Sequence, residues 1–240
     1  MKTKKILIGL ALLAVTVPQF VSAHERQLFN VGGTDYLMVV GSLGEPVVVD
    51  DKTGVDFRVV VADPADPTNS SASGVKPVTG LESEMKVEII AGEKKKTFDL
   101  TTVFNSPGAY KAIFFPTVKT ALSYRLTGMI NRTPIDLTFA CAPEGVKGVE
   151  DKTEVQISAG VRRLYKNGQF GCVVGKEELG FPEEGMSILG LHEKVTKEIS
   201  ASAGHIMMQI PTTKTAAALV LGLLGVILGL IALNKSKRKE

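Results

Sequence analysis

Residues 84–90 read Glu-Met-Lys-Val-Glu-Ile-Ile and alternate polar with apolar side chains. Successive side chains of a β-strand point to opposite faces, so this period of two predicts a strand with one buried and one solvated face. The next residues, 91–94 (Ala-Gly-Glu-Lys), predict a turn into a second strand over 97–100. The basic run 94–96 falls at this turn, where we expect a solvated tip.

Similar apolar runs lie on both sides of this hairpin. They predict strands at 36–40, 55–61, 109–115, 122–130 and 133–141, and Asn131-Arg132 predicts a tight turn between the last two. About eight short strands in about 115 residues, with turn signals every 8–12 residues, indicate an all-β fold, an immunoglobulin-like antiparallel β-sandwich over 24–142. The chain has no tryptophan, so the Cys…Trp…Cys core of antibody domains is missing and kinship with antibodies is not implied.

Both ends of the chain carry apolar segments. Residues 1–23 combine three early lysines, an apolar run of about a dozen residues and Val21-Ser22-Ala23, which is the pattern of a cleaved signal peptide. Residues 212–234 contain an uncharged apolar run long enough to predict one transmembrane helix. The basic tail 235–240 is then cytoplasmic by the positive-inside rule. We therefore expect a single-pass membrane protein whose N-terminal domain is extracytoplasmic, in the periplasm or at the cell surface.

Between the sandwich and this anchor, two further segments are expected. Residues 143–182 form an extension tied to the sandwich by a disulfide between Cys141 and Cys172, because both cysteines lie on the oxidising side of the membrane. A metal site with two thiolates is the alternative, but no CxxC spacing supports it. Residues 183–211 carry an apolar stripe at helical spacing, which predicts an amphipathic juxtamembrane helix. This helix either forms a stalk that pairs protomers or packs on its own domain.

The anchor itself contains Gly225 and Gly229 in a Gly-x-x-x-Gly spacing. Two glycines on one helix face allow a second membrane helix to approach closely, so these residues are the candidate helix-packing site for a homo-oligomer or another membrane protein. Glycine is also common in membrane helices that have no partner.

Composition and motifs disfavour two classes of function. The expected exported body, 24–213, has 20 basic and 24 acidic residues, a net charge of −4, so a nucleic-acid partner is not expected. Only three histidines occur, at 24, 192 and 205, and no nucleophile-elbow, zincin, phosphate-loop or dinucleotide motif is present. We expect no catalytic residues and no enzymatic activity.

His24 would be the first residue of the mature chain. A free α-amino group beside an imidazole chelates Cu(II), which makes His24 the candidate metal ligand and copper the candidate cofactor. The Ala23-His24 junction, the sandwich pattern and the stretches 107–110 (Pro-Gly-Ala-Tyr) and 124–128 (Tyr-Arg-Leu-Thr-Gly) resemble the CopC/YtkA-like exported copper-handling proteins. The resemblance implies further ligands from the sandwich. No histidine occurs between 25 and 191, and a carboxylate such as Asp35 is the alternative.

The sequence thus predicts a membrane-anchored extracytoplasmic binding or accessory module without catalytic activity, which presents loops such as 63–80 to a partner. Copper handling through His24 is the first alternative. The second is a structural component of the cell envelope that self-associates through the stalk and the transmembrane helix.

Overall fold

The computed structural model describes residues 24–143, 146 and 148–208. The expected leader 1–23, the expected anchor 212–234 with Gly225 and Gly229, and the tail 235–240 lie outside these residues. The chain divides into two compact units between Ser187 and Ile188, and each is described by itself.

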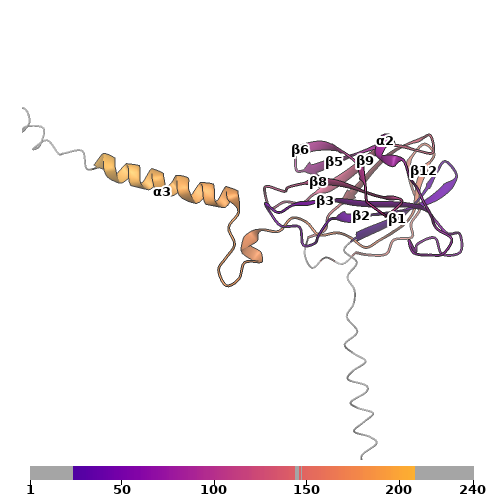
Figure 1. The fold of residues 1–240 in the computed structure, drawn as a ribbon, viewed down its shortest axis with the longest axis horizontal. Helices are drawn as coiled ribbons and strands as arrows, with labels where there is room; N and C mark the ends of the chain where they lie inside the picture. The colour runs from indigo at the N-terminus through magenta and orange to yellow at the C-terminus, as the bar shows by residue number, and fades with distance from the viewer. Residues whose placement is uncertain (1–23, 144–145, 147, 209–240) are drawn as a thin grey trace, which may run out of the picture. The chain divides into compact units, whose positions relative to one another are not determined.

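The first unit is a sandwich of two antiparallel sheets, which confirms the expected all-β class (Figure 1). Within the described residues the larger sheet has eight strands in the order β11-β12-β1-β2-β3-β8-β7, with β4 paired to β3. Its strands are β1 (His24–Val31), β2 (Thr34–Ser42), β3 (Thr53–Val61), β4 (Lys76–Pro77), β7 (Thr101–Thr102), β8 (Ala109–Phe114), β11 (Val155–Ser158) and β12 (Val161–Asn167).

The smaller sheet has the order β10-β9-β5-β6. It contains β5 (Met85–Ala91), β6 (Lys94–Asp99), β9 (Ser123–Ile130) and β10 (Thr133–Ala140). The alternation in 84–90 is confirmed, since Met85, Val87 and Ile89 are buried in the core while Lys86 is exposed. The tight turn between β9 and β10 is also confirmed, with positive φ at both Asn131 and Arg132. Two short helices, α2 (Leu81–Glu84) and the 3-10 turn η1 (Lys176–Glu178), complete this unit.

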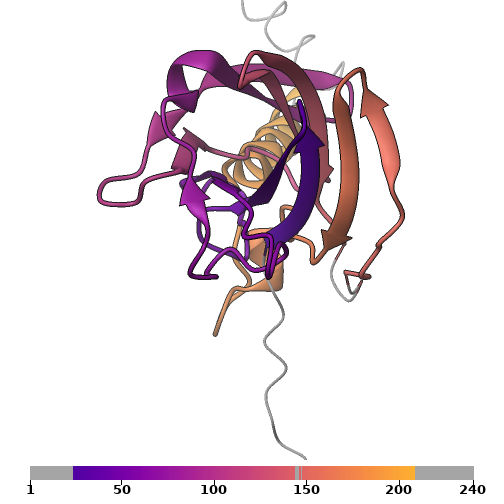
Figure 2. The ribbon, with the colours of Figure 1, turned by 90° about the vertical axis from the view of Figure 1, so that its right-hand side faces the viewer.

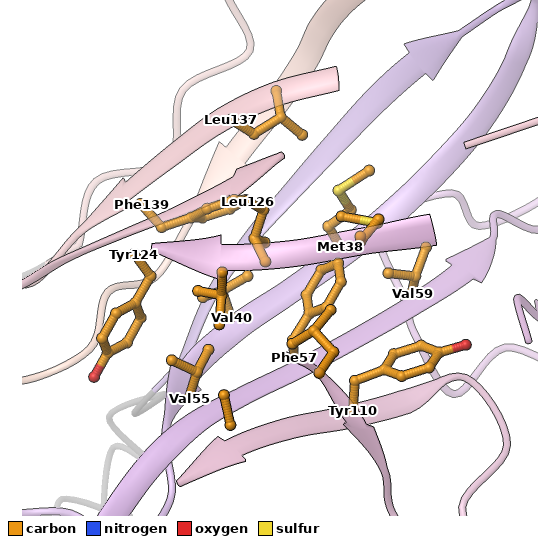
Figure 3. Packing of buried hydrophobic residues seen from close by; sticks show 14 of the residues in the cluster. Met38, Val40, Val55, Phe57, Val59, Tyr110, Tyr124, Leu126, Leu137 and Phe139 are labelled. Carbon is orange, nitrogen blue, oxygen red and sulfur yellow. The ribbon is translucent and has the colours of Figure 1, made fainter. Parts of the chain in front are cut away.

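The core lies between the sheets. Met38, Val40 and Phe57 of the larger sheet face Leu126 and Phe139 of the smaller one (Figure 3), and all of these side chains are at most 1% exposed. Burying large apolar side chains from two facing sheets is the main source of stability in such a layered fold.

The strand β1 was not expected from the sequence. It pairs with β2 on one side and with β12 on the other, so the indigo N-terminal strands lie beside the orange β12 in Figure 2 although they are distant in the chain. The segment 143–182 therefore contributes strands to the larger sheet. The expected disulfide between Cys141 and Cys172 is present and joins the residue after β10 to this segment.

The second unit begins with α3 (Ile188–Met208), which occupies most of the range expected for the juxtamembrane helix. Its apolar stripe is exposed, with Ile188, Leu191, Val195 and Ile199 all more than two-fifths accessible. Among the described residues, no helix combines the length and apolar character needed to cross a bilayer.

Candidate binding groove and the histidine row

A groove of about 600 Å³ opens at one edge of the sandwich, between β6 of the smaller sheet and β8 of the larger one. It exists because neither sheet is closed at this edge in the part of the chain that the structure describes. β6 pairs only with β5, and the short β7 pairs with β8 only at Tyr110 and Lys111. The end of β8 and the residues after it therefore form one wall. A volume of this size falls within the range of about 300–1,000 Å³ found for small-molecule sites.

The lining of the groove is mainly apolar. Phe98 of β6 and Phe114 of β8 meet at the floor with ring centroids 6.4 Å apart, which joins the two sheets. Phe115 and Val118 line the wall and remain 59% and 43% exposed. Large apolar side chains left accessible beside a cavity are typical of a binding surface.

Three consecutive lysines of β6, Lys94, Lys95 and Lys96, line the groove. The register pairs Ala91 with Lys94 and Ile89 with Lys96. Residues directly opposite each other in an antiparallel pair project from the same face. Since Ile89 is in the core, Lys94 and Lys96 occupy core-facing positions of an edge strand.

The partners of these lysines differ from those of their neighbours. Lys96 Nζ lies 5.1 Å from the Phe98 ring centroid, a cation–π contact. On the opposite face of the same sheet, Lys95 pairs with Glu88 at 3.8 Å and Lys86 with Asp99 at 3.1 Å. Among the ion pairs of the described residues, none involves Lys94 or Lys96. The ammonium groups of Lys94 and Lys96 therefore remain without an acidic partner among the described residues.

The lysines at 94–96 are exposed, as expected, but they do not form the tip of the turn. The turn consists of Gly92 and Glu93, and the lysines belong to β6 because they continue the hydrogen-bonded ladder with β5. A signal for the groove was nevertheless present in the sequence. Lys94, Lys96 and Phe98 recur at the strand period of two, which places the three side chains on one face.

His24 lies at the start of β1, on the outer face of the larger sheet. The register places His24 opposite Gly41 of β2, and Gly41 opposite Asp56 of β3. Gly41 has no side chain, so the imidazole reaches across it and His24 Nε2 lies 3.1 Å from Asp56 Oδ2. Both side chains are about one-third exposed, at 30% and 34%. We call these three residues the histidine row.

The carboxylate that lies beside His24 is that of Asp56 and not that of Asp35, which the sequence suggested. Asp35 lies at the other end of the β1–β2 hairpin, next to the turn. There its Oδ1 accepts a hydrogen bond of 2.6 Å from the side-chain nitrogen Nδ2 of Asn30. Within the described residues, no three or more His, Cys, Asp or Glu side chains are placed to hold a metal ion together. A metal at His24 would therefore need the α-amino nitrogen as a further ligand.

Glu45 lies in the turn region after β2 and is half-buried. Its Oε2 accepts a hydrogen bond of 3.3 Å from the Gly171 amide. Burial raises the pKa of the Glu45 carboxyl, while hydrogen bonds from the Gly171 and Ser42 amides and the nearby His24 oppose the rise. The carboxylate form is therefore less favourable here than in water.

The loop 63–80, which was expected to present a binding surface, is braced by its own side chains. Asp63 Oδ1 and Oδ2 accept hydrogen bonds from the backbone amides of Ala65 and Gly74 at 2.9 and 3.0 Å. Where the loop ends, the Tyr110 hydroxyl donates to the Val78 carbonyl at 2.7 Å. These contacts give the loop a defined shape, and its last residues, Thr79 and Gly80, line a smaller cavity of about 260 Å³.

Comparison of the chain with protein-family models, with curated proteins and with solved structures gives no significant match.

Proposed function

We propose that the protein is a non-enzymatic binding module whose binding site is the groove between β6 and β8. The observation that carries this proposal is the pairing of an apolar floor, made by Phe98 and Phe114, with two core-facing lysines at the mouth. An apolar cavity with a few placed polar groups is the usual form of a small-molecule site.

The proposal includes the setting in which the module works. A signal peptide at 1–23 exports the chain, a transmembrane helix at 212–234 anchors it, and the tail 235–240 stays in the cytoplasm. The sandwich, of the immunoglobulin-like type, then faces the periplasm or the cell exterior. The charge pattern at both ends of the sequence supports this topology.

A photoreactive amino acid at position 115 of the full chain, expressed in its own membranes, tests the binding module. We expect a covalent adduct at 115, in the groove wall. The matched control is position 104, because Phe104 is 88% exposed but does not line the groove. Adducts that are absent at 115, or equally abundant at 104, would remove the groove as the binding site.

Copper handling is the second candidate function, and the contact between His24 and Asp56 favours it. If the leader is cut after Ala23, the α-amino nitrogen, the imidazole and the Asp56 carboxylate supply two nitrogen donors and one oxygen donor, a set that suits Cu(II). Copper titration of the correctly processed chain, compared with a form that has one extra N-terminal residue and with Asp56→Asn, tests this function. Equal affinity in all three forms would end it.

A further inference from the structure

We propose that the occupant of the groove is a single long acyl chain that ends in a carboxylate, an amphiphile of the fatty-acid class. This inference rests on the proposed function and adds the chemistry of the ligand. It is carried by three properties of the groove: its apolar lining, the charge at its mouth and the edge strand that borders it.

The lining favours an acyl chain over a polar ligand. The inner surface is formed by Phe98, Phe114, Phe115 and Val118, together with apolar side chains of β5 and β8. An apolar chain that lies on this surface removes both its own area and theirs from water, and the gain in free energy is proportional to that area. A sugar or peptide backbone would lose hydrogen bonds to water there without replacing them.

The charge at the mouth favours a carboxylate head group. Lys94, Lys95 and Lys96 of β6 all line the groove. Lys95 also pairs with Glu88 at 3.8 Å, whereas Lys94 and Lys96 occupy the core-facing positions of the strand. Lysine side chains can lay their aliphatic stems along apolar surface and keep the ammonium group in water. Two ammonium groups at the end of an apolar groove therefore match an anionic head group and disfavour a cationic one.

The same lysines disfavour a peptide as the occupant. A peptide strand added to the free edge of β6 would place its own side chains in line with Lys94 and Lys96 and would cover their charges. Core-facing charges on edge strands are a common means by which proteins prevent such pairing. An acyl chain with a carboxylate head needs no backbone hydrogen bonds and leaves both ammonium groups at the solvent boundary.

Photolabelling tests the inference. The full chain is placed in nanodiscs of phosphatidylcholine and exposed to palmitic acid that carries a diazirine in its chain, and the labelled residues are mapped by mass spectrometry. We expect labels on groove residues such as Phe98 and Phe115. The methyl ester of the same probe lacks the charge, so it should label these residues at least about tenfold less.

Two double variants distinguish an effect of the groove lysines from an effect of lowering the net charge of the protein. Lys94→Gln with Lys96→Gln should lower labelling by the acid about tenfold and leave labelling by the ester unchanged. Lys76→Gln with Lys86→Gln removes the same amount of charge from exposed lysines that do not line the groove, and it should change neither. Equal labelling by acid and ester in the natural sequence, which needs no variant, would overturn the inference. An equal loss in both double variants would also overturn it.

Failure here differs from failure of the proposed function. An adduct to a polypeptide at position 115 in cells would support a binding module and overturn the fatty acid as its ligand. Absence of any adduct at 115, together with absence of fatty-acid labelling, would overturn both.

Discussion

Tyr124 of β9 stacks on Phe170, which follows β12, with ring centroids 4.9 Å apart and ring planes 7° from parallel. Both side chains are almost completely buried. The stack connects the smaller sheet to the segment that carries the second cysteine, so this segment contributes to the core as well as to the sheet.

Replacement of Phe170 by Ala should therefore destabilise the sandwich by about 3–5 kcal/mol, because it removes a buried ring and leaves a cavity. Phe170→Leu should cost clearly less, since it fills more of the space. Urea unfolding of the full chain, followed by circular dichroism, measures both. A loss below about 1 kcal/mol for Phe170→Ala would mean that the segment after β12 does not take part in the cooperative unit.

Removal of the disulfide should lower stability by about 3–4 kcal/mol in the variant with Cys141→Ser and Cys172→Ser. The bridge closes a loop between positions separated by 31 residues, and its loss frees the unfolded chain. Unfolding of the natural chain with and without reductant gives the comparison. Reductant should have no effect on the double variant, which serves as the control.

Arg132→Gly should stabilise the protein by about 0.5–1 kcal/mol. Arg132 adopts φ of 63° in the turn between β9 and β10, a conformation that glycine reaches without the steric cost of a Cβ atom. Asn-Gly is the preferred pair for this type of two-residue turn. Thermal unfolding checks the gain. Arg132→Ala keeps the Cβ atom and should not stabilise, so an equal gain in both variants would contradict this explanation.

Glu45→Gln should raise stability at neutral pH. Burial raises the pKa of the Glu45 carboxyl above its ordinary value of 4.5, so the ionised form reduces the stability of the folded state. The advantage of glutamine should be complete above the raised pKa and should disappear as the pH falls through it to about 4. Chemical unfolding between pH 4 and 8 measures the difference.

The exposed Glu93, in the turn between β5 and β6, provides the matched control for this experiment. Glu93→Gln should not reproduce the gain in stability at neutral pH, because this side chain is exposed. A gain for Glu45→Gln that stays constant over the whole pH range would show that its origin is not the ionisation of the carboxyl.

Strands could be predicted where the alternation of polar and apolar residues in the sequence matches the alternation of exposed and buried side chains in the structure. The strand over 84–90 was predicted because its apolar residues face the core and its polar residues face solvent. β1 was missed because Glu25 and Gln27 occupy core-facing positions. Glu25 is 1% exposed, and its charge is balanced by Lys166 Nζ at 2.8 Å. That lysine comes from β12, which no local pattern can indicate.

The period of two places Lys94, Lys96 and Phe98 on one face of a strand, but the sequence does not show that this face borders a groove. Whether Lys94 and Lys96 face the core depends on the register between β6 and β5, and the sequence marks only the turn between them. The contact between His24 and Asp56 likewise depends on two registers across three strands. The disulfide was accessible to prediction because only two cysteines are present and the expected compartment favours their oxidation.

The pairing of β1 with β12 has a consequence for the order in which a nascent chain can assemble. All strands of the smaller sheet have been synthesised once Ala140 is added, whereas Asn167, the partner of Arg26 on β12, is added 27 residues later. One side of β1 stays uncovered until then. Contacts between such distant parts of a chain form slowly, so closure of the larger sheet is among the last steps that synthesis permits.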